Sequence, residues 1–109
     1  MTTTTQTPDT DRLARELKLY AQNTYELYEQ YQAIERTTDK RIDAGTDEEA
    51  VKAHAIHCLE IWLDKAAHMY GREVGYHAFP RFTMAAKAQA AEEIAEEIVD
   101  EYEYRKPYR

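Results

Sequence analysis

The amino-acid sequence predicts an all-α protein, a three-helix up-down-up bundle with a long first helix and heptad-like packing. Apolar residues recur at alternating steps of three and four over residues 10–43, 47–70 and 83–104, which is the spacing of one buried helix face. The 109 residues include only three glycines and three prolines, too few for the many turns of a β-sandwich. This length suits a single domain with one modest core.

The first predicted helix is the longest element and follows a polar, threonine-rich segment. We expect residues 1–9 to form a flexible tail and residues 10–109 to form the single domain. The spacing predicts a helix over residues 10–43 that packs against its neighbours at about 20°. Its expected core residues are Leu13, Leu17, Tyr20, Thr24, Leu27, Tyr31, Ile34 and Thr38.

A tight connection follows this helix. Gly45 can adopt the left-handed conformation that ends a helix, and Thr46 with Glu49 has the spacing of a capping box for the next one. So short a link makes the first two helices antiparallel neighbours. The core face expected for residues 47–70 is wide and centred on Trp62. It comprises Val51, Ala55, Cys58, Leu59, Ile61, Trp62, Leu63, Ala66 and Met69.

Residues 71–80 interrupt the helical pattern with two glycines, one proline and two aromatic residues, Tyr76 and Phe79. We expect a loop with aromatic anchors in this stretch. A third helix is predicted over residues 83–104, and its alanines permit close approach of a neighbouring helix. Its expected core residues are Met84, Ala88, Ala91, Ala95, Ile98 and Tyr102.

The formal net charge of −7 comes entirely from one segment. Acidic and basic residues balance in the rest of the chain. Residues 92–103 carry no basic residue and contain Glu92, Glu93, Glu96, Glu97, Asp100, Glu101 and Glu103. A surface of this sign repels nucleic acid, so we do not expect direct nucleic-acid binding.

This acidic face has two interpretations. It can steer a protein partner with a basic surface, or imitate the phosphates of nucleic acid and so inhibit a nucleic-acid-binding enzyme. Alternatively it is a solvated face, offset by the basic residues Arg36, Lys40 and Arg41 of the first helix. The candidate partner-binding residues on this face are Glu93, Glu97 and Asp100.

Tyrosine is unusually frequent, with nine residues in the chain. Tyr25 lies nearly opposite the core face of the first helix and forms a second stripe with Ala14 and Ala21, flanked by Tyr28 and Gln32. Tyrosine is common in protein interfaces. The candidate surface comprises Tyr25, Tyr28, Tyr76 and Phe79. The alternative is that the tyrosines cover residues 76–82 of the same chain.

The length of the first helix predicts self-association. About 34 residues at a rise of about 1.5 Å give a helix roughly 50 Å long, longer than either of its partners. An overhanging first part would expose Leu13 and Leu17. We therefore expect a homodimer or a higher homo-oligomer.

No catalytic residues or cofactor are predicted, and the single cysteine, Cys58, lies on the predicted core face. Two pairs of residues have helical spacings that suit metal ligands, His54 with His57 and Asp64 with His68. The pairs lie roughly 10 Å apart along the axis, so a metal would need ligands from another helix. The alternative is a partly exposed edge of the core.

These observations favour a non-enzymatic interaction protein, an acidic helical inhibitor or accessory factor that binds a protein partner. Size and charge resemble those of inhibitors encoded by phage or mobile elements. The alternatives are a metal-binding bundle and a structural subunit of a larger assembly. The lack of a signal-peptide pattern and of a long apolar run favours a cytoplasmic protein without a membrane span, and one cysteine suits a reducing compartment.

Overall fold

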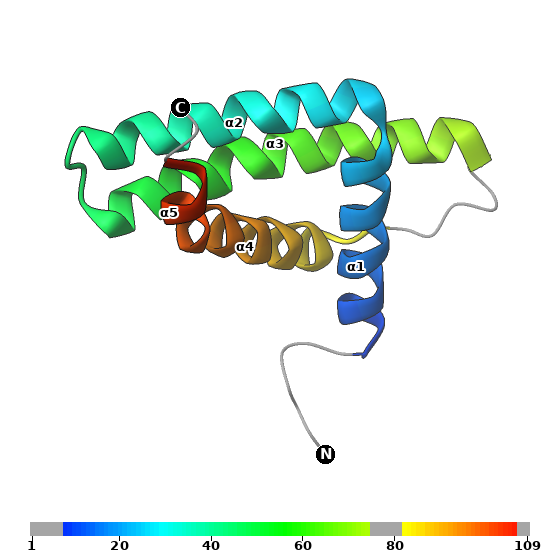
Figure 1. The fold of residues 1–109 in the computed structure, drawn as a ribbon. Helices are drawn as coiled ribbons and strands as arrows, with labels where there is room; N and C mark the ends of the chain where they lie inside the picture. Colours follow the sequence, from blue (N-terminus) through cyan, green and yellow to red (C-terminus); the bar gives the residue numbers. More distant parts are fainter. Residues whose placement is uncertain (1–7, 75–81, 107–109) are drawn as a thin grey trace, which may run out of the picture.

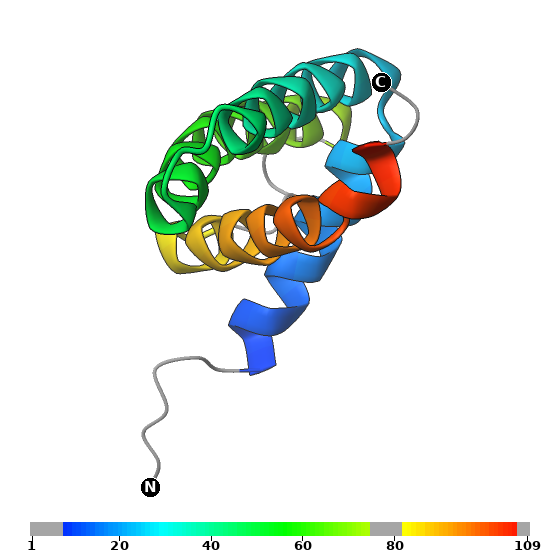
Figure 2. The same cartoon turned by 60° about the vertical axis from the view of Figure 1, so that its left-hand side comes forward.

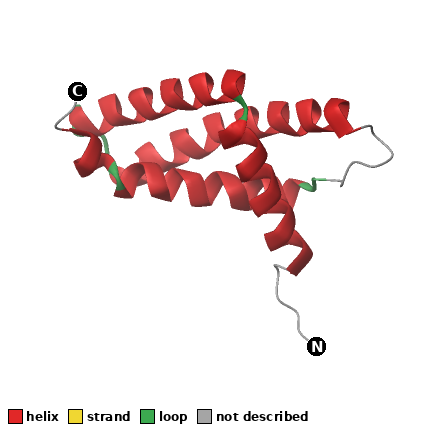
Figure 3. Cartoon of the chain, turned by 45° about the vertical axis from the view of Figure 1, so that its right-hand side comes forward, coloured by secondary structure: helices red, strands yellow, loops and turns green. Residues whose placement is uncertain are grey.

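The computed structural model describes residues 8–74 and 82–106. Every regular element in these two ranges is a helix, which confirms the all-α class (Figure 3). The helices are α1 (Pro8–Asn23), α2 (Tyr25–Asp43), α3 (Glu48–Val74), α4 (Met84–Asp100) and α5 (Tyr102–Arg105). Residues 1–7, most of the predicted tail, lie outside the described residues.

Three helices lie side by side and alternate in direction, namely α2, α3 and α4, while α1 crosses them at a steep angle (Figure 1). α1 packs against all three. The short helix α5 follows α4 and reaches towards α2 (Figure 2). Because two of the three predicted helices are each divided, the exact three-helix up-down-up topology is not confirmed.

The predicted helix over residues 10–43 is interrupted at Thr24. This residue has extended dihedral angles, with φ −100° and ψ 120°. Its hydroxyl donates a hydrogen bond to the carbonyl of Tyr20 at 2.7 Å, and its own carbonyl accepts from the backbone N–H of Tyr28 at 2.8 Å, within the first turn of α2. A threonine hydroxyl competes in this way with the regular helical hydrogen bonds. The chain therefore changes direction between α1 and α2.

This turn removes the predicted overhang. Leu17 and Ala21 are fully buried and Leu13 is nearly so, in one core with residues of α3 and α4. The expectation that Leu13 and Leu17 are exposed is therefore wrong. Burying a leucine contributes about 1.5–3 kcal/mol, whereas a hydrogen bond lost from the helix costs only about 0.5–1.5 kcal/mol. Packing of α1 across the bundle outweighs continuity of the helix.

The link between α2 and α3 has the expected glycine but a different cap. Gly45 has a φ of +81°, and it and Thr46 donate their backbone N–H groups to carbonyls in the last turn of α2, as a Schellman motif requires. The residue that caps α3 is Asp47, whose carboxylate accepts from the N–H groups of Glu49 at 3.1 Å and Ala50 at 3.4 Å. The predicted capping box is therefore wrong, because a carboxylate suits the positive helix end better.

The core is built around α3. Its indole side chain, Trp62, is buried and donates a hydrogen bond from Nε1 to the carbonyl of Leu27 in α2 at 2.8 Å. On the α4 side the small residues permit close helix packing, as predicted. The fully buried alanines of α4 are Ala86, Ala90, Ala91 and Ala95. None of the described helices combines the length and apolar character that a membrane span needs.

Two predicted core residues lie on the surface. Ile61 is 62% exposed and Met84 is 85% exposed. Ile61 points away from the buried face of α3, and Met84 is the first residue of α4, two positions before the buried Ala86. α3 also continues through Gly71 to Val74, further than the predicted end at residue 70.

Ion pairing fixes the C-terminal helix on α2. Arg105 makes a bidentate contact with Asp39, with Nη2 at 2.6 Å from Oδ1 and Nε at 3.0 Å from Oδ2. Nη2 also donates to the carbonyl of Ile98 at 2.6 Å. Beside this pair, the hydroxyl of Tyr102 donates to the carboxylate of Asp43. These contacts explain why the predicted helix over residues 83–104 bends between α4 and α5.

Glu35 beside this cluster predicts an unusual pH dependence. Burial raises the pKa of Glu35 more than the nearby Arg105 guanidinium, 3.7 Å away, lowers it. The folded protein therefore holds the Glu35 proton more tightly than the unfolded chain does, and ionisation with rising pH costs stability. We expect the wild type to lose stability relative to Glu35→Gln as the pH rises from about 4, near the ordinary pKa of glutamate, through the raised pKa of the folded state. Urea unfolding of both proteins across this range measures the difference, and parallel curves would contradict it.

Candidate functional site

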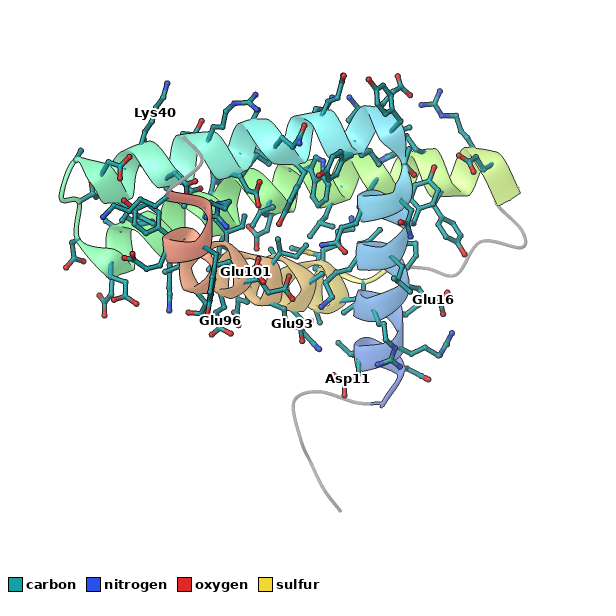
Figure 4. The ribbon with its side chains drawn as sticks, in the orientation of Figure 1. Asp11, Glu16, Lys40, Glu93, Glu96 and Glu101 are labelled. Carbon is teal, nitrogen blue, oxygen red and sulfur yellow. The ribbon has the colours of Figure 1, made fainter. Side chains whose placement is uncertain are left out.

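A groove with a volume of about 610 Å³ opens between α1 and α4. Its lining is entirely polar or charged, and carboxylates outnumber cationic side chains five to two. The lining residues are Asp11, Arg15, Lys18, Gln89, Glu93, Glu96, Glu97 and Asp100. Figure 4 shows Asp11 on α1 and Glu93 and Glu96 on α4 along the same edge of the molecule. The groove is thus a concave acidic site with two helical walls.

Gln89 ties the two walls together. Its Nε2 donates to Asp11 Oδ1 of α1 at 2.9 Å and to Glu93 Oε2 of α4 at 3.0 Å. Gln89 is only 9% exposed, and its Oε1 has no hydrogen-bond partner within the described ranges. A buried acceptor without a donor costs about 1–3 kcal/mol.

Glu93 is an ionised residue of the groove that pairs with a cation of the opposite wall. Burial raises the pKa of Glu93. Hydrogen bonds from Lys18 and Gln89, together with the charge of Arg15, lower the pKa by more than burial raises it, so the net shift is downward. Lys18 Nζ lies 2.8 Å from Glu93 Oε1. Glu93 is therefore ionised at neutral pH. The cation that pairs with it belongs to the opposite wall of the groove.

The structure brings together the three acidic residues that the sequence singled out. Glu93, Glu97 and Asp100 line one groove, although the sequence had placed them only on a common helix face. The cation that pairs with this face is Lys18 of α1. By contrast, Lys40 lies on the outer side of α2, away from α4 (Figure 4). The expected offset by cations at the end of the first helix is therefore wrong for Lys40.

The predicted tyrosine surface is only partly present. Tyr25 is 74% exposed and Tyr28 is also exposed, both on α2. Ala14 and Ala21, however, are buried in the core, because the turn at Thr24 rotates their helix relative to α2. The second stripe is therefore not one continuous surface. The two loop aromatics of the prediction, Tyr76 and Phe79, lie outside the described residues.

The two residue pairs of α3 considered as metal ligands, His54 with His57 and Asp64 with His68, make other contacts in the structure. The ring nitrogens of His54 lie 3.9 Å from Cys58 Sγ, and His68 Nδ1 lies 2.9 Å from the backbone carbonyl of Asp64. A hydrogen bond from Lys87, at 2.6 Å, lowers the pKa of the Asp64 carboxylate. Residues 8–74 and 82–106 contain no group of three or more histidine, cysteine or acidic side chains placed to hold a metal.

Sequence reasoning missed the α1 wall of the groove. Asp11, Arg15 and Lys18 are spaced four and three apart, beside the helix face that packs in the core. This polar stripe is visible in the sequence, but it resembles any solvated helix face. Only the crossing of α1 over the bundle places it beside α4, and that crossing depends on the turn at Thr24.

Comparison with known proteins adds no assignment. No protein-family model matches the chain, and neither the curated proteins nor the solved structures contain a match to it. The function must therefore be argued from the groove and its charges.

Proposed function

We propose that this chain is a non-enzymatic, acidic interaction protein that holds a basic segment of a partner protein in the groove between α1 and α4. The single observation that carries the proposal is the concave site of about 610 Å³ with five carboxylates around it. Binding pockets of proteins range over roughly 300–1,000 Å³. The groove therefore has room for several side chains of an extended segment.

The acidic wall of α4 supports a cationic ligand energetically. Glu93 with Glu97, and Glu96 with Asp100, are like charges one helical turn apart. Each such pair destabilises a helix by about 0.2–0.5 kcal/mol. Lysine or arginine side chains that bridge these carboxylates would relieve the repulsion. Of the two cations of α1, Lys18 pairs with Glu93, and Arg15 would meet a carbonyl or carboxylate group of the same segment.

The cellular role that suits this chemistry is that of an inhibitor or accessory factor. By covering a basic surface, the chain would compete with other acidic ligands of its partner, including nucleic acid. Long-range attraction between acidic and basic surfaces also accelerates association. Self-association stays a prediction, but the argument from an overhanging α1 no longer supports it, because Leu13 and Leu17 are buried.

Neutralising the α4 wall tests the proposed function. We expect the triple variant Glu96→Gln, Glu97→Gln, Asp100→Asn to bind a fluorescein-labelled arginine-rich peptide at least about tenfold more weakly than the wild type, about 1.4 kcal/mol. Fluorescence anisotropy at low salt measures the dissociation constants. Added salt should weaken wild-type binding, since the Debye length is only about 10 Å at 0.1 M.

A matched control separates the groove from net charge. Glu26, Glu29 and Glu103 are exposed acidic residues that do not line the groove. Replacing these three with glutamine removes the same charge, and we expect it to change affinity by less than about threefold. Equal losses in the two triple variants would contradict a groove-bound segment and indicate diffuse attraction instead. Circular dichroism checks that both variants remain helical.

A further inference from the structure

A second groove, with a volume of about 370 Å³, lies between α3 and the beginning of α4. Its apolar lining comes from both helices, with Ile61 on α3 and Met84 and Ala88 on α4. Lys87 Nζ of α4 lies 2.6 Å from Asp64 Oδ1 of α3 and bridges the two walls. This groove is therefore a built, two-walled site, separate from the acidic groove on the α1 side of α4.

The groove brings two exposed large apolar side chains together. Ile61 and Met84 are among its most exposed large apolar residues, and both line the same groove. Removal of adjacent apolar surface from water is favourable wherever a partner covers both at once. Exposed apolar patches with a polar rim commonly mark protein interaction sites. Methionine adapts its shape to different partner side chains.

The charges at the rim define the partner. Lys87 neutralises Asp64, whereas no cation among the described residues pairs with Glu60, which also lines the groove. The local charge that remains is acidic. A second copy of the chain would present the same acidic patch across a two-fold axis, and its net charge of −7 would oppose the contact. A partner with a basic residue beside its apolar anchor is favoured.

We propose that this groove docks an amphipathic helix of a partner protein, with a leucine-sized side chain between Ile61 and Met84 and a lysine or arginine opposite Glu60. Grooves between two helices receive a third helix through apolar residues spaced three and four apart. The site goes beyond the acidic groove, because its affinity depends on apolar side chains as well as on charge.

Synthetic peptides test this docking site. The probe is a labelled 16-residue amphipathic helix with leucines on one face and lysines beside them. Two matched peptides replace either the leucines with alanine or the lysines with glutamate. We expect the leucine–lysine peptide to bind, and the double variant Ile61→Gln, Met84→Gln to weaken it at least about tenfold. Glu60→Gln should weaken it less and reduce its salt dependence.

A control variant and two further readouts complete the test. The double variant Leu19→Gln, Tyr104→Gln removes two exposed apolar side chains outside the groove, and binding should not change. NMR shifts of residues 60–64 and 84–88 should move when the peptide is added. Equal binding of the alanine peptide would overturn the proposal and assign the probe to the acidic groove. Absence of binding up to about 1 mM peptide, or a dimer that only Ile61→Gln, Met84→Gln dissociates, would also overturn it.

Discussion

Replacing Arg105 with methionine is expected to lower the free energy of unfolding by about 3 kcal/mol, the lower end of the range for a broken buried ion pair. The guanidinium makes a bidentate contact with Asp39, which is only 2% exposed, and also binds the carbonyl of Ile98. Methionine fills similar space but leaves the Asp39 carboxylate without its guanidinium. Urea unfolding followed by circular dichroism measures the loss.

Two further variants decide how this loss is interpreted. Lys106→Met removes the same charge from the next position, where the ammonium lies over the Tyr102 ring, and it should cost less than about 1 kcal/mol. The double variant Asp39→Leu, Arg105→Met should recover much of the lost stability, because the most deeply buried carboxylate of the cluster is then removed together with its partner. Strictly additive effects of the two replacements would show that the ion pair does not couple α5 to α2.

Replacing Trp62 with alanine is expected to lower the free energy of unfolding by about 3–5 kcal/mol. The indole is buried at the centre of the bundle, contacts the Tyr31 ring at a centroid distance of 5.4 Å and bonds the Leu27 carbonyl. Its removal leaves a large cavity between α2 and α3. Because Trp62 is the only tryptophan, circular dichroism rather than fluorescence must follow the unfolding of both proteins.

A neighbouring residue provides the control. Ile61→Ala changes an exposed side chain on the same helix, and we expect it to alter stability by no more than about 0.5 kcal/mol. Trp62→Phe keeps most of the apolar volume and removes the N–H donor. We expect loss of the hydrogen bond to Leu27 to lower the free energy of unfolding by about 1–2 kcal/mol. A Trp62→Phe protein as stable as the wild type would show that this hydrogen bond adds nothing.

The sequence predicted those features of the fold that depend on local chemistry. The helical spacing, the left-handed Gly45 and the small α4 face are all present. Each follows from residues within one or two turns of each other, so the pattern alone is sufficient.

Features that depend on distant contacts were not predictable. The break at Thr24 occurs because Leu17 gains a buried place across the bundle, and periodicity contains no such information. For the same reason the acidic residues of α4 were recognised but not the opposing wall. Gln89 joins the two walls of the groove, but in the sequence it is simply one polar residue within an alanine-rich helix.

The helix α1 has two functions at once. Leu17 and Ala21 complete the core, while Arg15 and Lys18 on the adjoining face form a wall of the acidic groove. A conformer in which α1 detaches from the bundle would have neither. Any ligand of the groove therefore binds only the docked conformer and shifts the equilibrium towards it by mass action. Affinity for the partner and local stability of the first helix are thus thermodynamically linked. A variant that weakens the docking of α1 also weakens binding of the partner.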